Sequence, residues 1–171
     1  MTQVRSTGTF SKKPPIPFER ASELFCYDGQ TGLVKFVTGE KAGQLAGFSD
    51  ASGYLKVKVA DKIIAIHRLI WLLETGEWPQ GIIDHIDGNP LNNTWSNLRL
   101  ANKSQNSMNA KTPCTNKTGF KGVRACGEKF NAQIKFNGKK YSLGNFETAE
   151  QAHAAYRGAA KVLFGEFARS Q

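Results

Sequence analysis

The stretch from Ile82 to Asn106, IIDHIDGNPLNNTWSNLRLANKSQN, determines the fold of the first half of the chain. It begins with a short apolar strand that ends in Asp84 and His85, and a Gly-Asn-Pro turn follows. A second strand and a polar segment, which we predict to be helical, complete the stretch. Asn97 lies in this second part. Acid, histidine, turn and amide in this order are what a site that cleaves phosphodiesters with one metal ion requires.

The side chains of this stretch suit the roles of such a site. His85 can act as a general base because the unperturbed pKa of histidine lies near neutral pH. Asp84 offers a carboxylate oxygen and Asn106 an amide oxygen to a divalent ion, whose shell water and substrate oxygens would complete. Neighbours on a regular strand point to opposite faces, so Asp84 and His85 share a site only where the strand bends or ends. The turn at Gly88 provides that irregularity.

The pattern DHIDGNPLNN, followed by NLR and then QN, resembles the HNH endonuclease motif of the ββα-metal fold, in the variety common among phage and intron-encoded enzymes. By this resemblance His85 is the general base, and Asp84 and Asn106 are the metal ligands. Asn97 is the middle asparagine that ties the loop to the helix and orients the base. Asparagine stands at position 106 where some relatives place a final histidine, which favours Mg²⁺ over tightly bound zinc.

Other interpretations of single residues stay open. A lone Asp-His pair at a strand end is most often a structural pair, and only the full set of residues favours catalysis. We interpret His67 as structural, whereas Arg68 and Arg99 are candidate DNA phosphate contacts. The residues that we interpret as turn formers are Gly88, Asn92 and Asn93.

The cysteine and histidine content narrows the choice of metal. Cys26, Cys114 and Cys126 are widely spaced and form no CxxC pair, so we expect free thiols in a reducing compartment, the cytoplasm of a bacterial host cell. With only three histidines, a bound metal is expected to be a hard ion held mainly by oxygen, Mg²⁺ or Mn²⁺. We expect no small-molecule cofactor.

Charge is distributed unevenly along the 171 residues, whose net charge is +9. Residues 1–110 hold 12 Lys and Arg against 10 Asp and Glu, whereas residues 111–171 hold 11 against 4, a net charge of +7. A basic module of this kind usually binds a polyanion, most often nucleic acid. The longest apolar run, residues 63–73, is interrupted by His67 and Arg68 and is too short to span a bilayer, so no membrane partner is expected.

Stretches that contain glycine and proline divide the chain into four segments. We expect a flexible arm over residues 1–20, a nuclease module over 21–110, a linker over 111–118 and a second module over 119–171. Short β-like runs cover residues 33–37, 54–59 and 63–66. Apolar residues at 66, 69, 70 and 73 then predict a helix that ends near Gly76.

The second module is predicted to be a three-stranded sheet packed on one helix. Strands are expected over residues 120–125, 130–136 and 140–143, and Asn137-Gly138 indicates a type I′ hairpin. Thr148 followed by Gln151 is typical of a capping box, and Gly165 would end the helix. The apolar stripe predicted for this helix comprises Ala152, Ala155, Tyr156, Ala159 and Leu163.

Alternation along these strands separates an apolar face from a basic, amide-rich face. A face of this kind can enter the major groove of DNA, where Arg and Lys hydrogen-bond guanine and Asn or Gln hydrogen-bond adenine. Solvated strands without a ligand are the plainer alternative. The candidate DNA-binding residues on this face are Arg124, Asn131, Gln133, Lys135, Lys140 and Ser142.

Residues 119–168 also resemble the plant APETALA and ethylene-response-factor type DNA-binding domain. The resemblance rests on Gly122-Val123-Arg124, Lys129-Phe130, Ala132 with Ile134, Leu143-Gly144 with Phe146, and the helical AxxAAY pattern. Phenylalanine replaces the usual tryptophan at position 130, and Ala125-Cys126-Gly127 replaces an arginine-rich stretch. DNA binding by a three-stranded sheet is therefore the expectation that the resemblance supports, without the plant target sequences.

Together these features predict an α+β chain, with a small antiparallel sheet and a ββα-metal HNH module before a three-stranded sheet on one helix. The predicted function is a metal-dependent endonuclease of phage or homing type that acts on double-stranded DNA. One active site in a monomer would most simply nick. Two alternatives are a non-catalytic DNA-binding regulator and a protein directed to RNA, which binding to duplex DNA and RNA across a salt series would separate.

Overall fold

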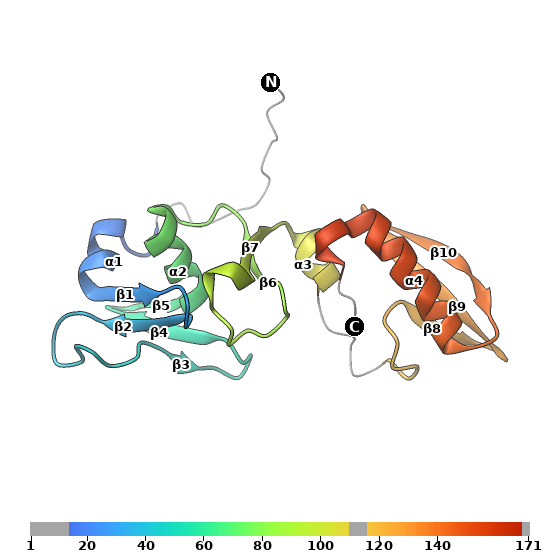
Figure 1. Cartoon of the computed structure of the whole chain (residues 1–171), viewed down its shortest axis with the longest axis horizontal. Coiled ribbons are helices and arrows are strands. Elements are labelled where there is room, and N and C mark those ends of the chain that lie inside the picture. Colours follow the sequence, from blue (N-terminus) through green and yellow to red (C-terminus); the bar gives the residue numbers. More distant parts are fainter. Residues whose placement is uncertain (1–13, 110–115, 169–171) are drawn as a thin grey trace, which may run out of the picture. The chain divides into compact units, whose positions relative to one another are not determined.

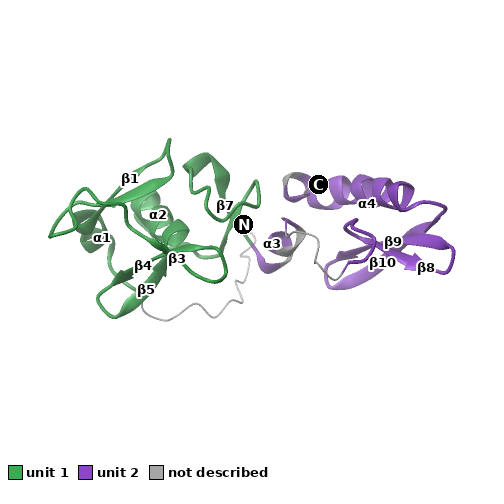
Figure 2. Cartoon of the chain, turned by 90° about the horizontal axis from the view of Figure 1, so that it is seen from below, with its two compact units in different colours: residues 1–101 green, residues 102–171 purple. Residues whose placement is uncertain are grey.

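Residues 14–109 and 116–168 are described by a computed structural model of the chain. They form helices and small antiparallel sheets (Figure 1), which confirms the predicted α+β class. Two units are distinguished, residues 1–101 and residues 102–171 (Figure 2). The sequence placed residues 102–110 with the first module, whereas the structure groups them with the second. This grouping does not test where one domain ends and the next begins, so the predicted limits at residues 110 and 119 stay a prediction.

The first unit holds three small sheets, and each pairs antiparallel strands that are close in sequence. The strands are β1 (Phe25–Asp28) with β2 (Leu33–Phe36), β3 (Phe48–Ser49) with β4 (Leu55–Val59) and β5 (Lys62–Ala65), and β6 (Ile82–His85) with β7 (Leu98–Ala101). The predicted limits of β2, β4 and β5 are right to within one residue, β6 and β7 were predicted without exact limits, and the two-residue β3 was not predicted. The sequence missed β1, a four-residue run in which only Phe25 is buried.

Helix α2 (Ile66–Thr75) is the centre of the core of this unit. Ile66, Leu69, Ile70 and Leu72 are at most 1% exposed, and burial of each aliphatic side chain stabilises the fold by roughly 1.5–3 kcal/mol. The helix ends at Gly76, whose φ of 77° is left-handed. The predicted helix and its end are both confirmed, since the apolar spacing of 3.6 residues is what a buried helical face needs.

Ordered structure begins earlier than the sequence predicted. The predicted arm reached residue 20, but α1 (Phe18–Leu24) begins at Phe18, and its Ala21 is fully buried. Ile16 is also buried, and its carbonyl accepts a hydrogen bond of 2.9 Å from Trp78 Nε1. Contacts with residues that lie about sixty positions further along the chain thus order this segment. The rest of the predicted arm, residues 1–13, lies outside the described residues.

The second unit contains the predicted three-stranded sheet, in the order β10 (Lys139–Phe146), β9 (Lys129–Phe136) and β8 (Val123–Cys126). Helix α4 (Ala149–Phe164) lies along the sheet (Figure 1), and a short helix, α3 (Lys103–Asn109), precedes the sheet in the chain. Of the predicted linker, residues 111–115 lie outside the described residues, while Asn116 and Thr118 hydrogen-bond the Phe120 carbonyl.

Local turn and capping signals in this unit are confirmed. Asn137 and Gly138 have φ values of 48° and 80°, as a type I′ turn requires, and the Thr148 side chain accepts a 3.3 Å hydrogen bond from Gln151 N. The buried stripe of α4 consists of Ala152, Tyr156, Ala160 and Phe164. Part of the predicted stripe was wrong: Leu163 is 38% exposed because the buried row advances by four residues at each turn.

Two further findings concern predictions made from composition. No helix within residues 14–109 and 116–168 is long and apolar enough to cross a membrane. Cys26 and Cys126 are exposed free thiols, whereas Cys114 lies outside the described part of the chain.

Candidate active site

Strand β6 positions Asp84 and His85 at the end of the β6–β7 hairpin. Both side chains are buried, with exposed fractions of 5% and 4%. The register pairs Asp84 with Arg99 and His85 with Leu98. Because successive side chains of a strand point to opposite faces, the two residues have different neighbours, and both faces are covered. A buried carboxylate and a buried imidazole are each costly unless a partner holds them.

Arg99 is a partner of Asp84. Its Nε and Nη2 atoms both lie 2.9 Å from Asp84 Oδ2, and both side chains are largely shielded from solvent. Removal of either partner would leave the other charge buried, which costs about 3–5 kcal/mol in known cases. The sequence proposed Arg99 as a DNA contact; the structure places its guanidinium on Asp84, and a DNA contact stays a prediction.

Asn93 is a partner of His85. Asn93 Oδ1 lies 3.1 Å from His85 Nε2, and Asn93 Nδ2 donates to the Leu91 carbonyl at 3.4 Å. An amide oxygen can only accept, so His85 Nε2 carries a proton in this pair, and whenever the ring is neutral its lone pair is on Nδ1. This is the tautomer that a general base working through Nδ1 needs.

The sequence indicates only a turn former at Asn93, but this residue is 2% exposed and among the most buried side chains. The hydroxyl of Tyr27 donates to the Asn93 carbonyl at 2.8 Å. Gly32, with a φ of 73°, approaches so closely that a Cβ there would lie 2.7 Å from the Asn93 carbonyl carbon. The β1–β2 hairpin therefore holds the backbone of Asn93. Neither contact can be predicted from the sequence, because both residues lie far from Asn93 in the chain; Tyr27 is 66 residues away.

Asn97 ties the turn to the start of β7, whereas the tie between loop and helix that the family resemblance implies stays a prediction. Its Oδ1 accepts from Asp87 N at 3.0 Å, and its Nδ2 donates to Asp87 Oδ1 at 3.0 Å and to the Asn92 carbonyl at 2.7 Å. These bonds fix the loop between the two strands. The orientation of His85 by Asn97 stays a prediction, since the side-chain partner seen on His85 Nε2 is Asn93.

His67 and Tyr54 cover the imidazole of His85. The ring centroids of His67 and His85 are 5.3 Å apart and nearly perpendicular, and Tyr54 lies 5.5 Å from His67 and 6.0 Å from His85. Burial, with smaller contributions from His85 and Arg68, lowers the pKa of His67 to about 3. His67 is therefore neutral at physiological pH. The structural role predicted for it is compatible with this packing.

We expect the neutral state of His67 to make folding stability depend on pH. Its pKa is about 6.5 when unfolded and about 3 when folded, so its contribution is present above pH 6.5 and is lost as pH falls toward 3. The free energy of unfolding of the native chain should rise with pH between about pH 4.5 and 6. Replacement His67→Gln should make this rise less steep by up to ~1.4 kcal/mol per pH unit. Denaturant unfolding of both proteins at several pH values measures this. Equal slopes would show that His67 is not held neutral.

Arg68, a second candidate phosphate contact, has intramolecular partners. Its Nη1 donates to the Gly81 carbonyl at 3.2 Å and its Nη2 to the Pro79 carbonyl at 3.4 Å. Burial lowers its pKa from the usual value. Arg68 thus fixes the connection between α2 and β6, and the predicted DNA contact remains untested.

The predicted metal ligands fall in different units of the chain. Asp84 is in the first unit, and Asn106 is a half-buried residue of α3 in the second. Their donor atoms, a carboxylate and an amide oxygen, suit a hard divalent ion. Within the described residues, no group of three or more His, Cys, Asp and Glu side chains is placed to hold a metal. The joint ligation of one ion by Asp84 and Asn106 stays a prediction.

The structure places the six candidate DNA-binding residues of the second unit on one sheet face. Directly opposed residues of neighbouring strands share a face. The pairs in the register are Arg124 with Asn131, Ser142 with Gln133, and Lys140 with Lys135. The register shifts between Ser142 and Gly144, and this irregularity brings Asn145, which the sequence missed, to 2.9 Å from Asn131 Nδ2. Contact of this face with DNA stays a prediction.

Comparison with known proteins identifies the class that this arrangement defines. Residues 65–108, which run from the start of α2 through β6 and β7, match the model of an HNH endonuclease family. An uncharacterised HNH endonuclease of Acanthamoeba polyphaga mimivirus is 47% identical over 106 residues, which are 60% of this chain and 54% of that protein. Protein 3.8 of Escherichia phage T7 is 39% identical over 106 residues, which are 60% of this chain and 87% of the phage protein.

The chain therefore belongs to the HNH endonuclease family. The predicted enzyme class, a nuclease, is confirmed at the level of the family, whose members generally use a divalent metal ion. The chain spans about half the length of the mimivirus relative. No solved structure matches the chain. The family match ends at residue 108, so the resemblance proposed for residues 119–168 stays a prediction.

Proposed function

We propose that the chain is a metal-dependent DNA endonuclease in which His85 activates water and one divalent ion, Mg²⁺ or Mn²⁺, assists at the phosphate. The observation that carries the proposal is the buried pair of neighbours on β6, with Asp84 bound by Arg99 and His85 Nε2 bound by Asn93 Oδ1. The second hydrogen bond presets the neutral tautomer of His85. Burial and hydrogen bonding hold both side chains in one geometry, which is what a preorganised catalytic centre needs.

In the proposed reaction, His85 Nδ1 accepts a proton as a water oxygen attacks the scissile phosphorus. The bond from phosphorus to the leaving sugar oxygen breaks, and that oxygen takes a proton from solvent. Asn93 Oδ1 holds the imidazole while the ring becomes charged, and it stabilises the imidazolium through the Nε2 proton. An ion held by Asp84 and Asn106 would supply positive charge to the phosphate and the leaving oxygen.

The second unit is proposed to bind duplex DNA through the polar sheet face. Exposed Lys135 and Lys140 can neutralise phosphates, and half-buried Gln133 and Asn131 offer amides to base edges. The resemblance of residues 119–168 to a three-stranded DNA-binding domain supports this role. A monomer with one centre would nick one strand, and the phage relative supports a phage-encoded protein that acts in the cytoplasm of a bacterial host.

Cleavage of supercoiled plasmid tests the proposed function. The purified chain with Mg²⁺ or Mn²⁺ should convert supercoiled plasmid to the open circle, and EDTA should stop the reaction, with recovery when the ion is added in excess. Absence of cleavage in either ion, or cleavage that EDTA leaves unchanged, would contradict the proposal. Linear product without an open-circle intermediate would contradict nicking while leaving nuclease activity intact.

A further inference from the structure

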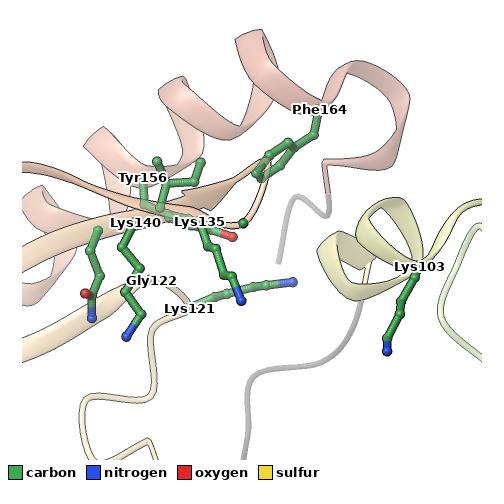
Figure 3. A pocket seen from close by; sticks show the side chains of 10 residues that line it. Lys103, Lys121, Gly122, Lys135, Lys140, Tyr156 and Phe164 are labelled. Atoms are coloured by element: carbon green, nitrogen blue, oxygen red, sulfur yellow. The ribbon is translucent and has the colours of Figure 1, made fainter.

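A basic pocket of 590 Å³ lies in the second unit, at the end of the sheet where β9 extends past β8. Four of the residues that line it are lysines, and Figure 3 shows them around it: Lys103 on α3, Lys121 beside Gly122, and Lys135 and Lys140 on the sheet. Tyr156 and Phe164 of α4 line it as well. Its volume is within the range of pockets that bind small ligands. None of the described lining residues is acidic.

Without a bound anion, two lysines of the pocket repel each other. Lys135 and Lys140 are directly opposed on β9 and β10, and like charges at this spacing destabilise a sheet. Within the described residues, neither makes an ion pair with an acidic side chain. An anion between them would remove the repulsion. A phosphate group suits this role, because its oxygens accept hydrogen bonds from several ammonium groups at once.

Two glycines of the pocket differ in their surroundings: the Cβ side of Gly122 is packed against Tyr156, whereas that of Gly138 is open. Gly122, with a φ of 76°, can carry no side chain, since a Cβ there would lie 2.1 Å from the Tyr156 ring. Gly138 in the hairpin turn has nothing within 4 Å of a Cβ position. The lysine side chains thus form the polar rim, and the rings of Tyr156 and Phe164 give apolar surface against which a sugar can pack.

We infer that this pocket binds a backbone phosphate of the DNA strand that the sheet face engages. The inference rests on the proposed function, in which the sheet face of the second unit binds DNA. The pocket at the end of the sheet adds a second contact with the same DNA. Lys135 and Lys140 belong to both surfaces, while Lys103 and Lys121 belong to the pocket alone. The pocket contributes affinity without base specificity, since phosphates carry no sequence information.

Two double variants test this inference in the full chain. Lys103→Gln with Lys121→Gln removes the pair that is specific to the pocket. Lys139→Gln with Lys161→Gln is the matched control, since these exposed lysines of the same unit do not line the pocket. Binding to a labelled duplex is measured by fluorescence anisotropy between about 50 and 200 mM salt, in EDTA so that no DNA is cleaved.

The pocket variant should bind more weakly, and the magnitude of its slope of log K against log salt should fall by roughly 0.9, the contribution of the one phosphate that the lysines no longer neutralise. The control should keep the native slope. Lys103→Arg with Lys121→Arg should restore it, which separates the removal of charge from a folding defect. Equal slopes for the pocket variant and the native chain, or an equal reduction in variant and control, would overturn the inference.

A free nucleotide is the other source of a phosphate, and ADP titrated into the native chain by calorimetry tests it. If ADP binds, the pocket variant abolishes that binding, and the slope for DNA stays native, the assignment to DNA is overturned. If the native chain does not cleave plasmid but its salt slope still exceeds that of the pocket variant, only the nuclease function is contradicted. If the native chain cleaves plasmid but its salt slope equals that of the pocket variant, only the phosphate binding by the pocket is contradicted.

Discussion

Replacement His85→Ala is expected to reduce the rate of plasmid nicking by about 10²- to 10⁴-fold, the usual contribution of a positioned general base. The loss should appear in the rate at saturating protein, because His85 is buried and its removal takes no exposed charge from the DNA-binding surface. Single-turnover nicking with Mg²⁺, together with duplex binding by anisotropy, measures both quantities. The dissociation constant should stay within about threefold of native, a difference of under 1 kcal/mol.

The control for this variant is its folding. Loss of the imidazole leaves Asn93 Oδ1 without its partner, which costs about 1–3 kcal/mol if the atom stays buried. Thermal unfolding must therefore show a folded protein at the assay temperature. Added imidazole, which can enter the space left by the side chain, should recover part of the activity. A folded His85→Ala protein that nicks at the native rate would exclude His85 as the base.

Replacement Asn93→Ala is expected to lower the nicking rate by about 10²-fold through misplacement of His85. The alanine removes the acceptor on His85 Nε2, so the ring loses both its fixed orientation and its preset tautomer. Because Asn93 acts through His85, the rate should fall while DNA affinity does not. Asn93→Asp, which keeps an oxygen acceptor, should retain more activity than Asn93→Ala, and the pH dependence of its rate should change.

Asn92→Ala is the matched control, since Asn92 adjoins Asn93 but binds Asp87 Oδ2 through Nδ2 and Thr94 through Oδ1. This control should lose stability comparable to that of Asn93→Ala and keep most of the nicking rate. If both variants lose activity in proportion to stability, Asn93 has only a structural role in the turn.

The β1–β2 hairpin supports Asn93, so in the proposed mechanism this part of the chain helps to orient His85. Residues 65–108 are the part that matches the family model, and both Tyr27 and Gly32 lie before it. The geometry of the His85 site therefore depends on a segment outside the matched region. In the proposed mechanism the family motif supplies His85 as the base, while the preceding hairpin holds the backbone of Asn93, which orients that base.

Sequence alone predicted the elements whose signals are local. The α2 pattern with its end at Gly76, the Asn137-Gly138 turn and the Thr148 cap each follow from neighbouring residues, and all three are present. The β6 and β7 strands with Asp84 and His85 also follow from a compact motif. These features could be predicted because backbone preference and burial indicate the same structure in each of them.

Features that depend on distant contacts could not be predicted. The start of α1 is ordered by packing on the core, and the contact of Ile16 with Trp78 spans 62 residues. Asn93 looked like its neighbour Asn92 because both follow a turn, and only the fold distinguishes the buried Asn93 from the half-buried Asn92. Arg68 and Arg99 looked like free cations, but backbone carbonyls and Asp84 bind them.

The position of Arg99 also bears on metal binding. Arg99 Nε and Nη2 both contact Asp84 Oδ2, so an ion bound at this oxygen must share it with the guanidinium or displace it. Sharing would keep the pair intact and place a second positive charge near the phosphate. The buried ion pair is thereby linked to the proposal that Asp84 and Asn106 hold one divalent ion beside His85.

A crystal structure of the chain soaked in Mn²⁺, with the ion located by anomalous scattering, tests the proposed catalytic centre itself. We predict one ion at about 2.1 Å from an Asp84 carboxylate oxygen and from the Asn106 amide oxygen, with His85 Nε2 still on Asn93. An ion bound away from both residues, in a protein that cleaves DNA with Mn²⁺, would contradict the proposed centre.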